Sequence, residues 1–156
     1  MDSGAIFSPC RTWRYVLWRV WDDALPKVAF IGLNPSTADE TQDDPTIRRC
    51  IGYARSWGYG GIRMLNLFAF RATDPKDLKA SDQPIGPENN SRLILWSESA
   101  QLRIAAWGAH GAYLNRGLEV QTALWRLDLH YLGLTKGGHP KHPLYLPKNL
   151  MPELWR

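Results

Sequence analysis

The segment Lys27–Leu33 (KVAFIGL) is a nearly unbroken apolar run that ends at Asn34-Pro35-Ser36. Such a run without polar alternation is typical of a strand covered on both faces, as in the centre of a parallel sheet. Two similar runs, Ile62–Leu67 and Leu102–Trp107, follow along the chain, and a shorter one spans His130–Leu134. These segments predict buried strands around which the rest of the chain is organised.

Helical patterns lie between these runs. Asp44-Pro45 is a typical helix start, apolar residues follow at helical spacing, and the stretch from Gly58 ends the pattern. Further helices are expected over Glu88–Ser97 and Leu118–Leu127, with a terminal helical turn after Asn149. Strands alternating with helices predict an α/β domain with a mainly parallel sheet. The opening Arg11–Asp22 is expected to be a strand, in an antiparallel edge position or as an alternative a helix.

Composition predicts one globular domain over residues 1–156, because the chain has 156 residues, 44% of them hydrophobic. No apolar run approaches the ~20 residues of a membrane helix, and basic residues interrupt any signal-peptide core near the start. A soluble, cytoplasmic protein without a membrane partner is therefore expected. Cys10 and Cys50 lack metal-type spacing, so we expect two buried, unpaired thiols and no iron–sulfur cluster.

The charge balance favours a polyanionic partner, since 19 basic and 15 acidic residues give a net charge of +4. Four acids, Asp39, Glu40, Asp43 and Asp44, lie together ahead of the first predicted helix. Paired carboxylates suit magnesium, but acids in this position are more often helix caps and dipole partners, which we favour. Asp39 is kept as a candidate water-orienting residue because it lies five positions after Asn34.

Parallel sheets bind ligands beyond the carboxyl ends of their strands, so the polar residues after each strand are the candidate site. After the first run, Gly32 permits close backbone approach and Pro35 restricts Asn34, which can both donate and accept hydrogen bonds. A helix cap or Asx turn is the alternative for Asn34. After the second run, Arg71 suits a phosphate or an ion pair with Asp74, and Phe68 or Phe70 suits base stacking or core packing.

The loop Gly137–Tyr145 combines two histidines, a lysine and prolines that stiffen it. A histidine fixed in this way suits a general acid, an anion stabiliser or a phosphate contact. The chain has no matching third and fourth metal ligand, no P-loop and no Gly-x-Ser-x-Gly elbow. Metal binding, P-loop phosphoryl transfer and serine hydrolysis are therefore not favoured.

Taken in order, these segments resemble the uracil-DNA glycosylase superfamily, particularly its mismatch-specific and thymine-DNA branch. The resemblance rests on Gly32-Leu33-Asn34-Pro35, Asn66-Leu67 with Arg71-Ala72-Thr73, Trp107-Gly108, and the loop with His139-Pro140 and His142-Pro143. The chain is also similar to a bacterial and phage family marked by GLNPSTAD (32–39) and PKHPLY (140–145), which has no established activity. Either His139 or His142 matches the motif histidine, and His142 is preferred because it lies inside the second signature.

The resemblance implies a three-layer αβα sandwich with a central, mainly parallel four-stranded sheet of order 2-1-3-4, plus an N-terminal strand or hairpin. It implies a DNA glycosylase-like hydrolase that flips a damaged, mismatched or modified base and needs no cofactor. Asn34 would position a water or bind the base, His142 would stabilise the leaving base or a flanking phosphate, and Lys141 and Arg71 would hold phosphates. The other expected substrate contacts are Gly32, Pro35, Ser36, Asn66, Phe68, Gly108 and His139. A non-catalytic reader of nucleic acid or of a modified base, and an enzyme acting on free nucleotides, are the alternatives.

Overall fold

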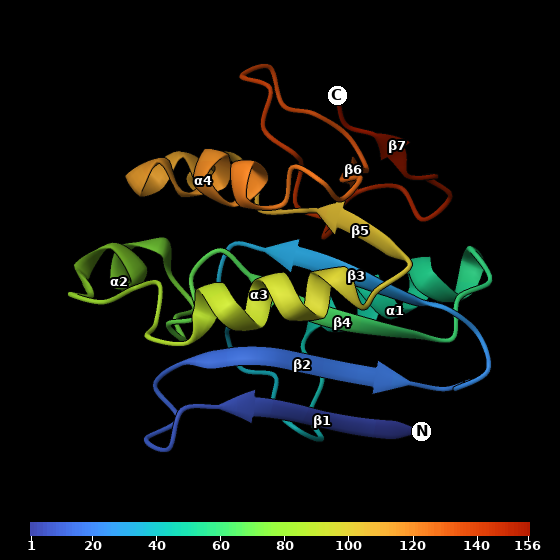
Figure 1. Ribbon diagram of the computed structural model, residues 1–156, viewed down its shortest axis with the longest axis horizontal. Coiled ribbons are helices and arrows are strands. Elements are labelled where there is room, and N and C mark those ends of the chain that lie inside the picture. The colour runs from blue at the N-terminus through green and yellow to red at the C-terminus, as the bar shows by residue number, and fades with distance from the viewer.

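The protein folds around one seven-stranded sheet in the computed structural model, which describes residues 1–156 (Figure 1). The strands lie in the order β1-β2-β4-β3-β5-β6-β7. Their bounds are β1 Asp2–Phe7, β2 Arg14–Val20, β3 Lys27–Gly32, β4 Gly61–Asn66, β5 Leu102–Ala105, β6 His130–Tyr131 and β7 Glu153–Leu154.

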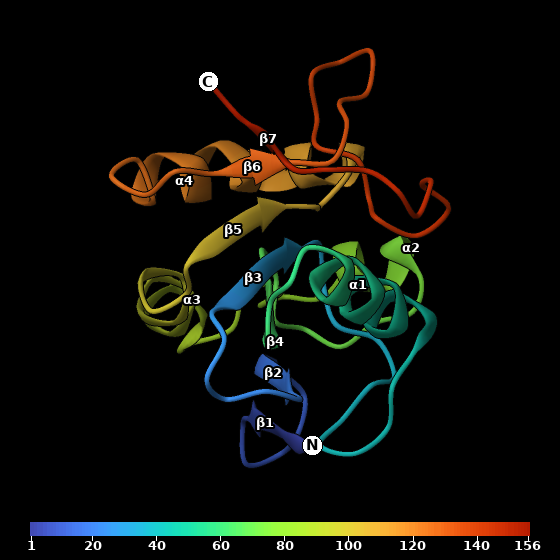
Figure 2. The same ribbon diagram turned by 90° about the vertical axis from the view of Figure 1, so that its right-hand side faces the viewer.

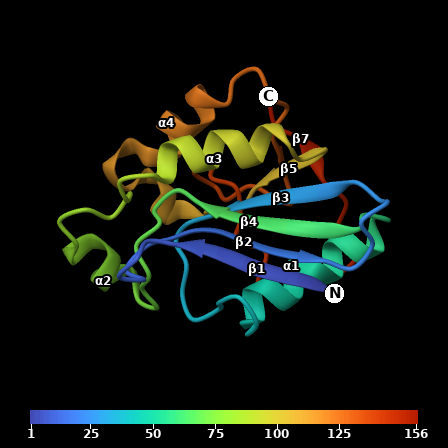
Figure 3. The ribbon, with the colours of Figure 1, turned by 60° about the horizontal axis from the view of Figure 1, so that its bottom comes forward.

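The prediction of a four-stranded, mainly parallel sheet is wrong, because the sheet is mixed. β4, β3, β5 and β6 pair in parallel, whereas β1, β2 and β7 join by antiparallel pairing. The hairpin of β1 and β2 continues the sheet beyond β4 (Figure 3). An uncovered β4 would leave a row of unpaired backbone groups, which β2 satisfies. β2 is therefore an interior strand, and the expected antiparallel edge position is held by β1.

Helices cover both faces of the sheet and create two separate cores (Figure 2). On one face α1 (Pro45–Ser56) packs against Val28, Phe30 and Ile62. On the other face α3 (Asn89–Glu98) and α4 (Arg116–Ala123) pack around residues such as Ile31 and Leu65. A short α2 (Pro75–Ala80) and the 3-10 turn η1 (Ala109–Asn115) complete the helical elements. The alternately facing side chains of β3 are all buried, as the apolar run predicts.

The predicted start of the first helix is confirmed in detail. Asp44 caps α1 by accepting a hydrogen bond from the Ile47 N–H at 2.9 Å, and Pro45 occupies the first turn. The expected helix at Glu88–Ser97 is α3, while α4 begins at Arg116 and ends at Ala123, earlier than predicted. The terminal helical turn after Asn149 is wrong, because Glu153–Leu154 pairs with β6 as a strand.

The two cysteines differ in exposure. Both are free, but Cys10 is exposed while Cys50 is buried on the inner face of α1, so the expectation of two buried thiols is wrong for Cys10. Cys10 lies in the turn between β1 and β2, where its side chain is not needed for the core. No helix of the protein is both long enough and apolar enough to cross a membrane.

Candidate functional site

A pocket of about 630 Å³ opens at the carboxyl ends of β3, β4 and β5. Both its place in the sheet and its size are typical of small-ligand sites. Its lining residues are Gly32 to Thr37, Asp44 to Ile47, Met64, Asn66, Ala72, Thr73, Pro75, Trp107 to His110, His142, Leu144 and Arg14. The predicted site residues among them are Gly32, Asn34, Pro35, Ser36, Asn66, Gly108 and His142.

Gly32 and Asn66 form the floor where β3 and β4 end side by side. The two residues are direct partners in the parallel pairing. A Cβ atom on residue 32 would come within 2.9 Å of the Asn66 Oδ1, so glycine leaves the space that the asparagine side chain occupies. Asn66 is almost fully buried, and its Nδ2 donates no hydrogen bond to the protein. A donor left unpaired in this way costs stability unless a ligand or water accepts from it.

Arg14, the first residue of β2, is a second buried donor on the same pocket. Its side chain is 2% exposed and takes part in no ion pair. Its Nη1 donates to the Ala38 carbonyl at 3.1 Å, but its Nε has no partner. Burial lowers the pKa of Arg14 to about 10, and the charge of Asp44 opposes this shift only in part. The pocket wall therefore carries a positive charge that lacks a full complement of acceptors.

Asn34 follows β3 and presents an acceptor to the pocket. Its Nδ2 donates to the carbonyl oxygens of Ala72 at 2.7 Å and Pro35 at 3.1 Å. Because both neighbours are acceptors, the amide nitrogen must face them and Oδ1 faces away. The Ala72 N–H also donates to the Pro35 carbonyl at 2.9 Å, which locks the loop after β3 onto the segment after β4. Oδ1 is thus held in place and free to accept from a water or a ligand.

Asp44 brings a carboxylate to the pocket from the start of α1. One of its oxygens, Oδ1, is used by the cap on Ile47, which leaves Oδ2 for other contacts. Its charge acts on both Arg14 and His142, raising the pKa of each against the effect of burial. It forms an ion pair with neither. Asp44 therefore favours the charged form of both Arg14 and His142 without an ion pair to either.

His142 lies exposed at the rim, on the loop after β6. Its Nδ1 accepts a hydrogen bond from the Leu144 N–H at 3.2 Å, so the neutral ring carries its hydrogen on Nε2. Partial desolvation by the surrounding loop lowers the pKa of His142, and Asp44 opposes the shift. The loop is fastened to the sheet by the Gly108 N–H, which donates to the Pro140 carbonyl at 2.7 Å. A neutral histidine with one hydrogen to donate is thus available at the pocket mouth.

Asp39 and Phe68 lie outside the pocket. Asp39 closes a turn, where the N–H groups of Gln42 and Thr41 donate to its carboxylate and lower its pKa. Phe68 is fully buried and packs against Tyr113, with ring centroids 5.7 Å apart. The structure thus gives Asp39 a turn-forming contact and places Phe68 in the core.

The remaining predicted residues also lie away from the pocket lining. Arg71 borders a neighbouring hollow and lies over the Phe7 ring, 4.9 Å from its centroid. His139 forms a tight turn with Thr135, whose N–H donates to the His139 carbonyl at 2.9 Å. Lys141 is exposed and rests its aliphatic chain on Gly133. Between the two motif histidines, only His142 reaches the pocket.

Metal ligands do not gather at this site or elsewhere. No group of three or more His, Cys, Asp or Glu side chains is arranged to hold a metal ion. The pocket instead combines neutral and positive donors with an amide acceptor and one carboxylate. This set suits recognition of a polar organic ligand and activation of a water.

Comparison with known proteins places this pocket in a family context. The family model described as "Protein of unknown function (DUF1643)" matches residues 14–144, which include the whole pocket lining. The protein belongs to this family. No curated protein matches, and no solved structure matches. These comparisons give no support to a relationship with the uracil-DNA glycosylase superfamily, so the DUF1643 family is the relationship established.

Sequence reasoning missed two of the charged groups on the pocket. The sequence predicts Asp44 as a helix cap or, with its acidic neighbours, as a magnesium ligand, and does not predict it on the pocket, although a cap near a post-strand loop can serve both purposes. Arg14 gave no signal, since arginines are rarely buried and its segment was interpreted as an edge strand. Trp107 and His110, which also line the pocket, could have been found from their position directly after a buried strand.

Proposed function

We propose that the pocket binds the base and sugar of a nucleotide and catalyses hydrolysis of the N-glycosidic bond between them. The observation that carries this proposal is the pair of buried, unpartnered donors, Arg14 Nε and Asn66 Nδ2, on the same pocket as the free Oδ1 of Asn34. Nucleobases present carbonyl and ring-nitrogen acceptors beside N–H donors, which match this arrangement. A base in the pocket would bring acceptors next to the two side chains that carry these unpaired donors.

The reaction uses these groups in complementary roles. A water that donates a hydrogen bond to Asn34 Oδ1 attacks the sugar carbon. A proton of this water passes to the Asp44 carboxylate, and the carbon–nitrogen bond breaks. The bonding electron pair leaves with the base, where Arg14 and Asn66 stabilise the negative charge. His142 donates a hydrogen bond from its Nε2–H to the departing base, which takes its proton from solvent, or to a neighbouring phosphate. Asp44 takes the water-orienting role first assigned to Asp39.

The resemblance to uracil-DNA glycosylases belongs to this proposal. It is supported by the position of Gly32, Asn34 and His142, which lie on one pocket although Asn34 and His142 are far apart in the chain. The mixed sheet and the family assignment do not add to that support. The proposed chemistry therefore rests on the pocket itself.

A non-catalytic reader of a modified base is the second candidate. It is favoured by the two hydrogen bonds from Asn34 Nδ2, which give this side chain a structural purpose independent of chemistry. The buried donors would then serve recognition alone. This candidate predicts base-dependent binding without bond cleavage.

Base release separates the two candidates. The substrates are oligonucleotides with uracil, mismatched thymine, hypoxanthine or hydroxymethylated pyrimidines, together with the matching free nucleotides. Wild type is compared with Asn34→Ala and Asp44→Asn. Asp74→Asn is the matched control, because Asp74 caps α2 as Asp44 caps α1 but lies off the pocket lining. Asparagine retains helix capping, so both Asp→Asn variants are expected to fold.

Release of a base by wild type and by Asp74→Asn, with a loss of at least about a hundredfold in Asp44→Asn, is the expected result. Equal release by all variants would remove Asn34 and Asp44 from the chemistry. Binding without release would favour the reader. Neither binding nor release across the panel, with a folded protein, would refute both candidates.

A further inference from the structure

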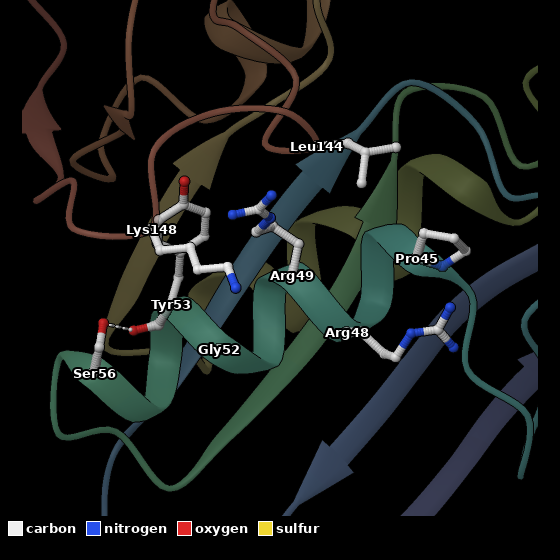
Figure 4. A pocket seen from close by; sticks show the side chains of 8 residues that line it. All are labelled: Pro45, Arg48, Arg49, Gly52, Tyr53, Ser56, Leu144 and Lys148. Atoms are coloured by element: carbon white, nitrogen blue, oxygen red, sulfur yellow. Dashed lines mark hydrogen bonds between the residues drawn. The ribbon is translucent and has the colours of Figure 1, made fainter.

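A second hollow of about 500 Å³ runs along α1 and adjoins the candidate pocket (Figure 4). Pro45 and Leu144 line both cavities, so the two are neighbours at these residues. We call this hollow the α1 groove; its lining residues are Pro45, Arg48, Arg49, Gly52, Tyr53, Ser56, Leu144 and Lys148. A ligand in the pocket can therefore reach the groove by extending past Pro45 and Leu144.

The α1 groove is lined by three cations, Arg48, Arg49 and Lys148, and none of them has an acidic partner. The ion pairs of the protein use Arg11, Arg19, Arg92 and Arg116. Arg49 and Lys148 belong to none of them, although Arg49 is half-buried. Figure 4 shows both side chains reaching over the same stretch of α1, while Arg48 extends away from them. Their charges concentrate a positive potential over one short segment of helix.

Lys148 is held in position by the attachment of its loop to α1. The Tyr53 hydroxyl donates to the Pro147 carbonyl at 2.6 Å, and the Trp57 Nε1–H donates to the Leu150 carbonyl at 2.9 Å. The Tyr53 and Trp57 rings stack with centroids 5.4 Å apart, which fixes both donors. These bonds flank Lys148 on both sides in the chain. The backbone on either side of Lys148 is therefore fastened to α1, on the same side of the helix as Arg49.

Gly52 lies on the exposed surface of α1, three residues after Arg49. Glycine inside a helix is unfavourable relative to alanine. Packing does not require it here, since a Cβ atom at this position would meet nothing within 4 Å. A bare backbone is useful where a ligand approaches the helix closely. Gly52 is thus an observation independent of the charges, and it points to a ligand at the same place.

We propose that the α1 groove binds phosphate groups of the substrate, with Arg49 and Lys148 as the cationic contacts and Gly52 as the open floor. This inference rests on the proposed function, because it takes the occupant of the neighbouring pocket to be the base and sugar of a nucleotide. Phosphates joined to that nucleotide, in a nucleic acid strand or in a nucleoside triphosphate, would extend past Pro45 and Leu144 into the groove. Arginine and lysine are the residues that bind phosphate most effectively.

Binding measurements on groove variants test the proposal. The probes are a short fluorescein-labelled DNA single strand of mixed sequence, followed by anisotropy, and deoxyuridine triphosphate, followed by calorimetry. The double variant Arg49→Gln/Lys148→Gln is compared with Arg55→Gln/Lys136→Gln, which removes the same charge at residues outside the groove. Gly52→Ala is the third variant, and thermal unfolding checks that it folds.

The groove double variant is expected to bind both probes at least about tenfold more weakly. For the DNA strand, the slope of log K against log salt concentration should be shallower by about 1.4, because two phosphate contacts are lost. The control double variant should change by less than about threefold. Gly52→Ala should bind more weakly while its Tm stays equal to or above that of wild type, because alanine favours the helix. Loss for the strand alone assigns the groove to a phosphodiester backbone, and loss for the triphosphate alone assigns it to terminal phosphates. Loss for both assigns it to phosphates in either setting.

Equal weakening in the groove and control variants would overturn the proposal, since general surface charge would then explain binding. Unchanged binding in the groove variants, or no binding of either probe to wild type, would overturn it as well. The proposed function is judged separately by base release. Groove variants that bind normally while Asp44→Asn loses base release would reject the groove alone, whereas phosphate binding without any base release would reject the glycosidic chemistry alone.

Discussion

Replacing Arg14 with methionine is expected to stabilise the protein while abolishing ligand binding. The guanidinium is buried at the pocket wall, with an unpartnered Nε and no ion pair. Methionine has a similar reach, is flexible and carries no charge, so it can fill the space without new polar atoms. The substitution therefore removes a buried charge at little expense in packing.

The size of the effect follows from the titration of Arg14. Burial lowers the pKa of Arg14 to about 10. This value is at least about 2 pH units below the ordinary range for arginine, and at ~1.4 kcal/mol per unit the difference corresponds to ~3 kcal/mol of destabilisation. At neutral pH the side chain is protonated in both the folded and the unfolded chain, so the whole penalty is present and is relieved only as the pH rises through about 10. Loss of the bond to the Ala38 carbonyl offsets about 1.5 kcal/mol, leaving a net gain of about 1.5 kcal/mol.

Urea unfolding followed by tryptophan fluorescence measures this change, and Arg19→Met is the matched control. Arg19 lies on the same strand and is equally buried, but it pairs with Asp43 and donates to the carbonyls of Trp18, Asp39 and Gln42. Arg19→Met should therefore lose about 3 kcal/mol. If Arg14→Met were destabilised to a similar extent, Arg14 would have a structural role, and the argument that its unpaired donor serves ligand binding would fail.

Three further results are expected. Hydrogen bonds to Thr12 and Ser8 lower the pKa of Cys10 to about 7, so the pH profile of its reaction with iodoacetamide should have a midpoint near that pH. Burial raises the pKa of Cys50, which should react only on unfolding, and equal rates for the two cysteines would contradict this. Desolvation lowers the pKa of His142, so the midpoint of its NMR titration should lie below the ordinary histidine value. The folded protein should therefore lose stability as the pH falls through about 6.5 and below, where the unfolded chain binds this proton more readily. Tyr145 has a φ of 77° and is 89% exposed, so Tyr145→Gly should raise the free energy of unfolding by about 0.5–1 kcal/mol in chemical denaturation; a loss would show that the side chain makes a stabilising contact.

Local patterns in the sequence were sufficient for the central strands and for α1. The apolar run before Asn34 and the Asp44-Pro45 start reflect constraints that act within a few residues, namely burial on both faces and helix capping. The size and directions of the sheet depend instead on distant partners. Asp2–Phe7 lacks a clear strand pattern and becomes β1 only because β2 offers it a register, while β2 in turn is recruited by the open side of β4.

The candidate site divides in the same way. The residues after β3 and β4 lie on the pocket because parallel strands present their carboxyl ends at one edge. The placement of Arg14 depends on tertiary pairing that no short window reveals. Asp39 and Asp44 belong to one acidic cluster, but only Asp44 lies on the pocket. The reason is local structure, since a turn closes on the Asp39 carboxylate whereas α1 begins at Asp44.

The tethers of the segment 139–150 have a consequence for motion. This segment supplies His142 and Lys148, but it lies outside the strands and is joined to the body by separate bonds at Gly108, Gly133, Tyr53 and Trp57. Such a segment opens locally with less free energy than the sheet requires to unfold. The part of the pocket wall formed by His142 and Leu144 and one side of the groove can therefore detach as a unit while β3 and β4 stay folded. Hydrogen exchange at the amides of this segment would register a bound ligand before any amide of the central strands.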